Sequence, residues 1–306
     1  MNKEVVHLFV EKGVVRMRYI IAVFIGACSY GVLSTIVKLA YRDGATTSLV
    51  TVGQFLIGWS VLFVCFLLTK RKEVIGQKDK VKLMLAGIPT GLVGVFYYLS
   101  LITIEASLAI ILLFQFVWIG ILFEFLIYRR IPDKVTIFSV FILMLGTTLA
   151  SGVMNGADHG ANLLGVIYGL LAAVSFALFI LTNATVLPKL RPIQRSYYMV
   201  TGSMVVVVMI FSPILIRGVD PSMITSFGQF GILLGLFGVV IPPLLFAYGM
   251  PQIGSALGSI LGSAELPVAV LLSMVILEEH VTVIQWCGVA ITIFGIVYPN
   301  IHSRSG

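Results

Sequence analysis

The sequence predicts an all-α membrane protein with ten transmembrane helices, arranged as a five-plus-five inverted repeat with both termini in the cytoplasm. Three observations support this prediction: the composition is too apolar for a soluble chain, the apolar residues form ten long runs, and the spacing of these runs repeats. Of the 306 residues, 59% are hydrophobic and 11% are charged, and the mean hydropathy is +1.07. Soluble domains are about 45–50% apolar and about 25% charged, so the excess apolar surface requires lipid.

The apolar runs are each about 20 residues long, the length that a helix rising about 1.5 Å per residue needs to cross the hydrocarbon core. Breaking segments rich in basic residues or proline separate several of them. Apolar and polar residues do not alternate along the runs, which excludes a transmembrane barrel. In chain order the predicted spans cover residues 19–40, 46–69, 82–102, 106–128, 134–153, 163–186, 195–216, 225–250, 254–277 and 281–299.

The basic residues set the predicted orientation. With a cytoplasmic N-terminus, every lysine and arginine except Lys38, Arg42 and Arg217 lies on the cytoplasmic side, as the positive-inside rule requires. Membrane topology thereby accounts for the net charge of +7, and a nucleic-acid partner is not indicated. We expect a multi-pass protein of the cell membrane, most simply the bacterial cytoplasmic membrane, whose partners are the lipid bilayer and a small-molecule substrate.

Residues 1–17 are predicted to form a cytoplasmic leader. Met17 directly precedes the first span, so residues 1–16 are a candidate start-site artefact. The three cysteines, Cys28, Cys65 and Cys287, lie in apolar stretches without the spacing of a metal site or a disulfide framework. We therefore expect no metal and no cofactor.

An internal repeat divides the chain into residues 18–153 and 162–301. Residues 102–108 align without gaps on residues 251–257, and with the same offset Gly146 aligns on Gly295. Because each repeat holds an odd number of spans, the second must enter the membrane upside down relative to the first. The charges agree with this, since the basic pair Arg129-Arg130 aligns on the acidic pair Glu278-Glu279.

The second repeat carries a recognisable motif. It runs from Ala-Glu-Leu-Pro-Val at residues 264–268 through Leu-Glu-Glu at residues 277–279 to Gln285, Gly288 and Gly295. This pattern resembles the signature of EamA-type transporters of the drug/metabolite transporter superfamily. The resemblance implies a secondary carrier that works by alternating access around a central cavity.

Three departures from that signature are visible. Leu266 is inserted between the glutamate and the proline, Glu278 or Leu277 stands where a glycine usually precedes the glutamate, and Trp118 stands in span 4 where the family commonly has a proline. The resemblance therefore bears on architecture and does not define the substrate.

Glu265 is the leading candidate for a functional side chain because it is the acidic residue nearest the middle of a span. A charge inside the bilayer is unfavourable by about 2.5–3.5 kcal/mol on insertion scales, so such residues are functional candidates. We expect Glu265 to line the cavity and to carry a proton or orient a polar substrate. The alternative is a neutral or hydrogen-bonded carboxyl group that only fixes helix packing.

The surroundings of Glu265 in span 9 indicate close packing and a kink. On a regular helix Gly254, Gly258 and Gly262 share the face of Glu265, and small residues at this spacing allow another helix to approach. Pro267 cannot donate to the carbonyl of the residue four positions earlier, so it should kink the helix there.

Span 8 is interrupted by Pro242 and Pro243, and span 3 carries Pro89 at the corresponding depth. Interrupted spans in transporters often flank the binding site, so we predict hinges at these positions. Plain kinks that serve helix packing are the alternative.

Other polar and aromatic residues in the spans are candidates to line a transport path, because a buried polar group needs a partner. Tyrosine and tryptophan near span ends also serve as interface anchors, so this alternative stays open. The candidates are Tyr30, Tyr97, Tyr98, Gln115, Trp118, Asn183 and Tyr248.

The sequence lacks a phosphate-binding GxxxxGK[ST] loop and the motifs of hydrolases and metalloproteases, so we expect no enzyme. The leading hypothesis is an exporter of a small metabolite or drug-like compound, with proton coupling through Glu265. An importer or exchanger is the alternative within transport, and a membrane-embedded enzyme or receptor is the alternative outside it. A homodimer is compatible with the sequence.

Overall fold

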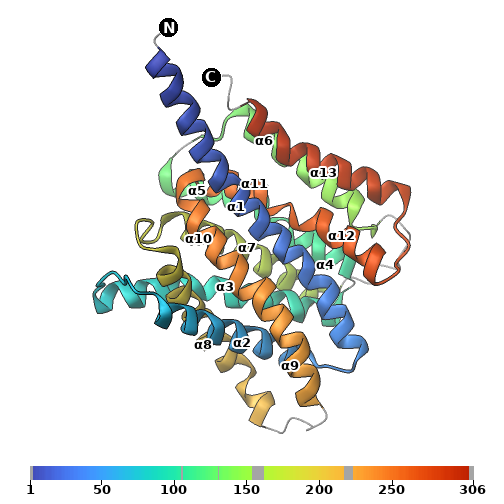
Figure 1. Cartoon of the computed structure of the whole chain (residues 1–306). Coiled ribbons are helices and arrows are strands. Elements are labelled where there is room, and N and C mark those ends of the chain that lie inside the picture. Colours follow the sequence, from blue (N-terminus) through green and yellow to red (C-terminus); the bar gives the residue numbers. More distant parts are fainter. Residues whose placement is uncertain (1–2, 105, 130, 154–161, 217–222, 303–306) are drawn as a thin grey trace.

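The computed structural model describes residues 3–104, 106–129, 131–153, 162–216 and 223–302. These described residues form helices joined by short connections, and the beginning of α1 and the end of α13 lie at the same end of the molecule (Figure 1). The first half contains α1 (Lys3–Arg42), α2 (Thr47–Leu68), α3 (Gln77–Thr103), α4 (Ala106–Leu113), α5 (Phe116–Tyr128) and α6 (Lys134–Ala150). The second half contains α7 (Leu163–Thr185), α8 (Pro192–Ile216), α9 (Met223–Leu234), the π-helix η2 (Gly235–Val240), α10 (Ile241–Ile253), α11 (Ser255–Gly262), α12 (Glu265–Ile276) and α13 (Val283–His302).

Several helix ends follow from the local sequence. Thr46 caps α2, Asp133 caps α6 and Asn162 caps α7, each side-chain oxygen accepting a backbone N–H of the first turn. At the end of α5, Arg129 adopts the left-handed conformation that commonly terminates a helix.

Eight helical segments in the described part of the chain are long and apolar enough to cross a membrane. Two further apolar helices, Lys134–Ala150 and Val283–Pro299, are shorter. The all-helical membrane fold is therefore confirmed, while the count of ten spans and their orientation stay predictions. The eight segments are Arg16–Arg42, Thr47–Leu68, Gln77–Thr103, Leu108–Tyr128, Leu163–Thr185, Pro192–Ser212, Gly228–Ile253 and Ser255–Ile276.

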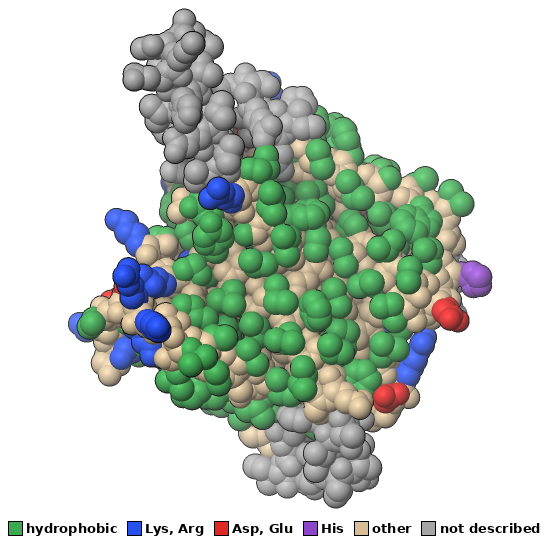
Figure 2. Space-filling model, in the orientation of Figure 1, with side chains coloured by type: hydrophobic (Ala, Val, Ile, Leu, Met, Phe, Trp, Pro, Cys, Tyr) green, Lys and Arg blue, Asp and Glu red, His purple; other side chains and the backbone are tan. Residues whose placement is uncertain are grey.

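The surface has the distribution that a bilayer requires. Figure 2 shows hydrophobic side chains across the middle of the visible face, with basic side chains gathered at one edge. Large apolar side chains such as Leu68, Phe141 and Met209 are exposed, as expected where the neighbour is lipid.

Helices of the two halves pack in corresponding pairs. Helix α1 packs against α10 and α12, and its counterpart α7 packs against α3, α4 and α5; α2 packs against α8, and α6 against α13. Close approach between α3 and α8 depends on two glycines, because a Cβ at Gly87 would collide with the backbone of Met199 and one at Gly202 with the backbone of Met84. The packing contacts of the core thus join the first half of the chain to the second.

The largest buried cluster lies around the middle of α1, where Val23 and Ala27 are fully buried. Phenylalanine rings from three helices fill it: Phe116 lies 4.5 Å from Phe176, and Phe179 lies 5.5 Å from Phe246, measured between ring centroids. This cluster fills one half of the bundle, and the other half contains smaller buried clusters around a cavity.

Candidate functional site

The half of the bundle opposite the phenylalanine cluster contains a cavity of about 530 Å³. Its lining residues on α1 lie in the C-terminal half of that helix, and further walls come from α2, α3, α4, α7 and α12. Phe176 and Phe179 belong both to its wall and to the buried cluster. The cavity therefore ends near the middle of the bundle, against the packed phenylalanine rings.

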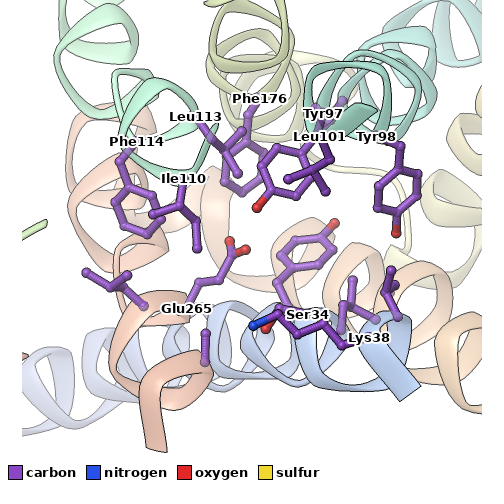
Figure 3. A pocket seen from close by; sticks show the side chains of 18 of the residues that line it. Ser34, Lys38, Tyr97, Tyr98, Leu101, Ile110, Leu113, Phe114, Phe176 and Glu265 are labelled. Carbon is purple, nitrogen blue, oxygen red and sulfur yellow. The ribbon is translucent and has the colours of Figure 1, made fainter. Parts of the chain in front are cut away.

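Glu265 is the first residue of α12, and its side chain points into the cavity (Figure 3). The carboxylate is partly exposed to the cavity, and no hydrogen bond or ion pair reaches it from any residue that the structure describes. Helix α1 passes directly beside it at Gly31, where a Cβ would collide with the Glu265 backbone oxygen. Glycine at this position allows the contact between α1 and α12.

The position of Glu265 depends on a break in span 9. Helix α11 ends at Gly262, and the turn that follows is tightened by bonds from Ser263 N–H to the Ile260 carbonyl and from Ala264 N–H to the Leu261 carbonyl. The break lies at the Ser263 carbonyl. Pro267, four residues later, has no N–H to donate to this carbonyl, which instead accepts the Leu266 N–H at 3.2 Å.

This break corrects one expectation. The sequence predicts one face shared by the three glycines and Glu265, but this face does not continue across the break. Gly254, with φ +83°, lies in the turn between α10 and α11. Gly258 instead lies against Met250, and Gly262 lies against Phe116 and Ile180. The glycines pack α11 within the closed half, while Glu265 faces the cavity.

Span 4 breaks at the corresponding position, which the sequence analysis did not predict. Helix α4 ends at Leu113 and α5 begins at Phe116, the residue that aligns on Glu265 in the repeat. A Cβ at Gly262 would lie 3.2 Å from the Phe116 ring, so the two broken helices meet. Discontinuous helices that meet at the centre of a bundle are typical of transporter binding sites.

Three of the predicted tyrosines share the cavity with Glu265, namely Tyr30, Tyr97 and Tyr98. The Tyr30 ring lies edge-on to Phe176 at 5.8 Å between centroids. The Tyr98 hydroxyl donates to Gln54 Oε1 at 3.4 Å. Gln54 was not predicted, although a glutamine inside an apolar span is a signal that could have indicated it.

The other four predicted residues do not line this cavity. Gln115 accepts a hydrogen bond from the Trp118 indole at 2.7 Å, and Trp118 is 42% exposed on the outer surface. Asn183 is buried and donates to the Phe179 carbonyl at 3.0 Å. Tyr248 is 42% exposed and packs against Tyr19, the arrangement expected of an interface anchor.

An ion pair stands at the rim of the cavity. Lys38 Nζ lies 2.8 Å from Glu279 Oε1 and 3.0 Å from Oε2, and the two side chains are 42% and 39% exposed. The pair links α1 to the connection between α12 and α13. The sequence places both residues on the predicted outer side but does not reveal that they meet.

The interruption of span 8 is a π-helix, η2, that also borders the cavity at Gly238. In this winding the Phe237 carbonyl would need an N–H from Pro242, which has none. The Ser29 hydroxyl of α1 donates to that carbonyl at 2.7 Å. Pro242 and Pro243 lie in the first turn of α10, whereas α3 continues as a helix through the buried Pro89.

The closed half is held by polar contacts as well as by the phenylalanine cluster. Arg195 in the first turn of α8 is 0% exposed and donates to the Ala247 carbonyl at 2.7 Å and to the Asn183 carbonyl at 2.6 Å. The sequence analysis placed Arg195 at the cytoplasmic boundary of a span. Because α8 begins at Pro192, Arg195 lies within the helix.

Glu124 of α5 closes a second contact in this half. Its Oε2 accepts the Ser255 hydroxyl at 2.5 Å and the Ala256 N–H at 2.6 Å. A carboxylate at a helix N-terminus satisfies free N–H groups and complements the helix dipole. Glu124 therefore fixes the start of α11.

Paired repeats, apolar helices and a cavity with polar side chains at the centre of the bundle are typical of membrane transporters. The family model of the EamA-like transporter family matches the sequence twice, at residues 17–152 and 163–300. The chain belongs to the EamA-like transporter family, which confirms the resemblance inferred from its motif.

The remaining comparisons bear on the fold alone. No curated protein matches the sequence, whereas the fold matches 28 chains of solved structure. One crystal structure, described only as that of a protein, is 15% identical, with a TM-score of 0.74 over 92% of this chain and 98% of its own. In the described residues no group of three His, Cys, Asp or Glu side chains could hold a metal ion.

Proposed function

We propose that this protein is a secondary transporter that exports a small metabolite or drug-like compound across the cytoplasmic membrane by alternating access. The observation that carries the proposal is the unpaired Glu265 carboxylate in a cavity that ends at the middle of the bundle. In the proposed topology of ten spans with cytoplasmic termini, the Lys38–Glu279 rim faces outward. This structure then represents an outward-facing state.

Alternating access is supported by the way in which one half is open and the other is closed. The cavity occupies one half, and the phenylalanine cluster with the Arg195 and Glu124 contacts fills the other. Because the halves are repeats, exchanging their conformations would close the cavity and open the opposite side. The breaks in spans 4 and 9 provide short rigid segments that can move separately.

Glu265 is proposed to couple this motion to protons. A carboxyl group in an apolar setting is unfavourable in its ionised form unless it is paired. The carrier without substrate would therefore change conformation with Glu265 protonated and neutral. If substrate and proton compete for this carboxylate, they move in opposite directions. An inward proton gradient then drives the substrate out of the cell.

Cysteine accessibility tests the proposed alternating access. Cys28, Cys65 and Cys287 are replaced by alanine, and Ser34, which lines the cavity, is replaced by cysteine. Right-side-out and inside-out vesicles are then treated with a membrane-impermeant maleimide. A transporter that alternates gives Ser34→Cys labelling from both sides.

Two variants control this experiment. Lys78→Cys, exposed in the first turn of α3, should react only from the cytoplasmic side and so reports vesicle orientation. Ser60→Cys, on the exposed face of α2, should resist the water-borne reagent because lipid covers it. Labelling of Ser34→Cys from one side alone would contradict alternating access and favour a fixed receptor pocket.

A further inference from the structure

We propose that the cavity accepts a monovalent organic cation with an aromatic or apolar body, and that the Glu265 carboxylate is its counter-charge. This inference rests on the proposed function, because it assumes that the cavity is the substrate site. It adds a chemical class to that site.

The charges of the cavity wall leave one negative charge uncompensated. Apart from tyrosines, the ionisable side chains that line the cavity among the described residues are Lys38, Glu265 and Glu279. Lys38 bonds both carboxylate oxygens of Glu279, so these two neutralise each other at the rim. The described part of the chain offers Glu265 no ion pair, and a buried charge without a partner is strongly unfavourable. A bound cation would supply the missing charge.

The helix dipoles at Glu265 do not replace such a cation. Helix α12 begins at Glu265, and its N-terminal end carries a partial positive charge. Helix α11 ends at Gly262 directly before it, and its C-terminal end carries the opposite partial charge. Because the two ends adjoin, their fields largely offset each other at the carboxylate.

Aromatic side chains around the carboxylate suit a cation with an apolar body. Figure 3 shows Glu265 directed into the same space as Tyr97, Phe176 and Ile110. The negative faces of aromatic rings attract ammonium groups, by about 0.5–2 kcal/mol per contact. A volume of about 530 Å³ lies within the roughly 300–1,000 Å³ typical of drug-sized ligands.

Other ligand classes fit less well. An anion would meet the Glu265 carboxylate and, within the wall, a lysine that already serves Glu279. A bare divalent metal would find a single free carboxylate, and no cluster of three ligating side chains occurs among the described residues. A dication would leave one of its charges unmatched. One carboxylate surrounded by rings therefore favours one positive charge on an apolar body.

Direct binding tests this inference without requiring flux. The full chain is placed in phosphatidylcholine nanodiscs and titrated with three probes that share a naphthylmethyl group: naphthylmethyl-trimethylammonium, naphthylacetamide and naphthylacetate. We expect the cation to bind saturably and about tenfold or more tighter than the neutral amide, with the anion weakest. Protein-free nanodiscs measure partition into lipid.

Two variants locate the selectivity. Glu265→Gln should bind the cation no better than the amide, and retained binding of the amide shows that this variant is folded. Asp79→Asn makes the same chemical change in the first turn of α3, outside the cavity, and should keep the preference for the cation.

The outcomes separate this inference from the proposed function. Equal or tighter binding of the amide or the anion, or no binding of any probe, overturns the cation assignment, while two-sided labelling of Ser34→Cys would still support transport. Selective cation binding together with one-sided labelling would support the cation site and overturn alternating access.

Discussion

The guanidinium group of Arg195 donates to the carbonyl of Ala247, the carbonyl that Pro251 leaves without its helical donor. Its second nitrogen donates to the Asn183 carbonyl, in the last turn of α7. One fully buried arginine of α8 thus satisfies free backbone acceptors on two other helices of the closed half. The charge is stabilised by carbonyl dipoles, and no carboxylate forms an ion pair with it among the described residues.

Replacing Arg195 with methionine should destabilise the protein. Hydrogen bonds to charged groups are worth about 1.5–3 kcal/mol each, so we expect a loss of several degrees in the melting temperature of the purified protein. Pro251→Ala supplies the Ala247 carbonyl with a backbone N–H, so the penalty of Arg195→Met should fall by about 1 kcal/mol in that background. Equal penalties in both backgrounds would show that the Ala247 contact contributes nothing.

Replacing Glu265 with glutamine should impair transport while the protein still inserts and folds. The amide matches the protonated acid in shape and charge but cannot gain or lose a proton. We expect the compound that accumulates outside cells expressing the wild type, identified by mass spectrometry of the medium, to be strongly reduced. Export at the wild-type rate with an unchanged pH dependence would remove Glu265 from the mechanism.

The sign of the pH dependence follows from the same carboxyl group. Raising the pH removes its proton and creates the negative charge that binds a cation, so cation affinity should rise with pH in the wild type and stay flat in Glu265→Gln. Titrations of the naphthyl cation at several pH values measure this. Among the described residues, the other ionisable groups that line the cavity are four tyrosine hydroxyls and the ion pair of the rim: Tyr30, Tyr41, Tyr97, Tyr98, Lys38 and Glu279.

Gly31→Ala should disturb the contact between α1 and α12. The added methyl group would collide with the Glu265 backbone oxygen and with Val268, and such overpacking typically destabilises by about 1–3 kcal/mol. Gly94→Ala is the matched control, since the nearest atom to its Cβ, in Phe55, lies at 3.6 Å. Thermal unfolding of both variants measures this difference. Equal melting temperatures for Gly31→Ala and Gly94→Ala would argue against a tight contact at Gly31.

Glu124→Ala should loosen the start of α11. The carboxylate accepts from the Ser255 hydroxyl and the Ala256 N–H, and loss of a helix cap destabilises by about 0.5–2 kcal/mol. Because Glu124 lies outside the cavity, the order of affinities for the three naphthyl probes should not change. A changed order with an unchanged melting temperature would assign Glu124 to the transport path instead.

The sequence predicts those parts of this fold that depend on local pattern. Long apolar runs locate the membrane helices, the acid nearest the middle of a span identifies Glu265, and Pro267 indicates which carbonyl loses its donor. Each of these depends on residue types within a few positions of one another. The family assignment followed from the same kind of local motif.

The parts that the sequence did not predict depend on contacts across the chain. The break before Phe116 contains neither proline nor glycine, and it lies where Phe116 meets Gly262 of the other repeat. The rotation of a uniformly apolar helix is not fixed by periodicity, so Trp118 could not be assigned to lipid in advance. The partner of Lys38 likewise lies in the opposite half.

Among the described residues, Glu265 is the single unpaired carboxylate that lines the cavity, and this bears on how transport responds to the membrane potential. If Glu265 is the only group that exchanges its charge partner, each cycle trades one proton for one monovalent cation and moves no net charge across the bilayer. The membrane potential then does no work on transport, although it acts on every uncompensated charge that crosses. The pH difference alone would set the limit: a tenfold proton ratio could sustain about a tenfold substrate ratio, and a collapsed potential would leave it unchanged.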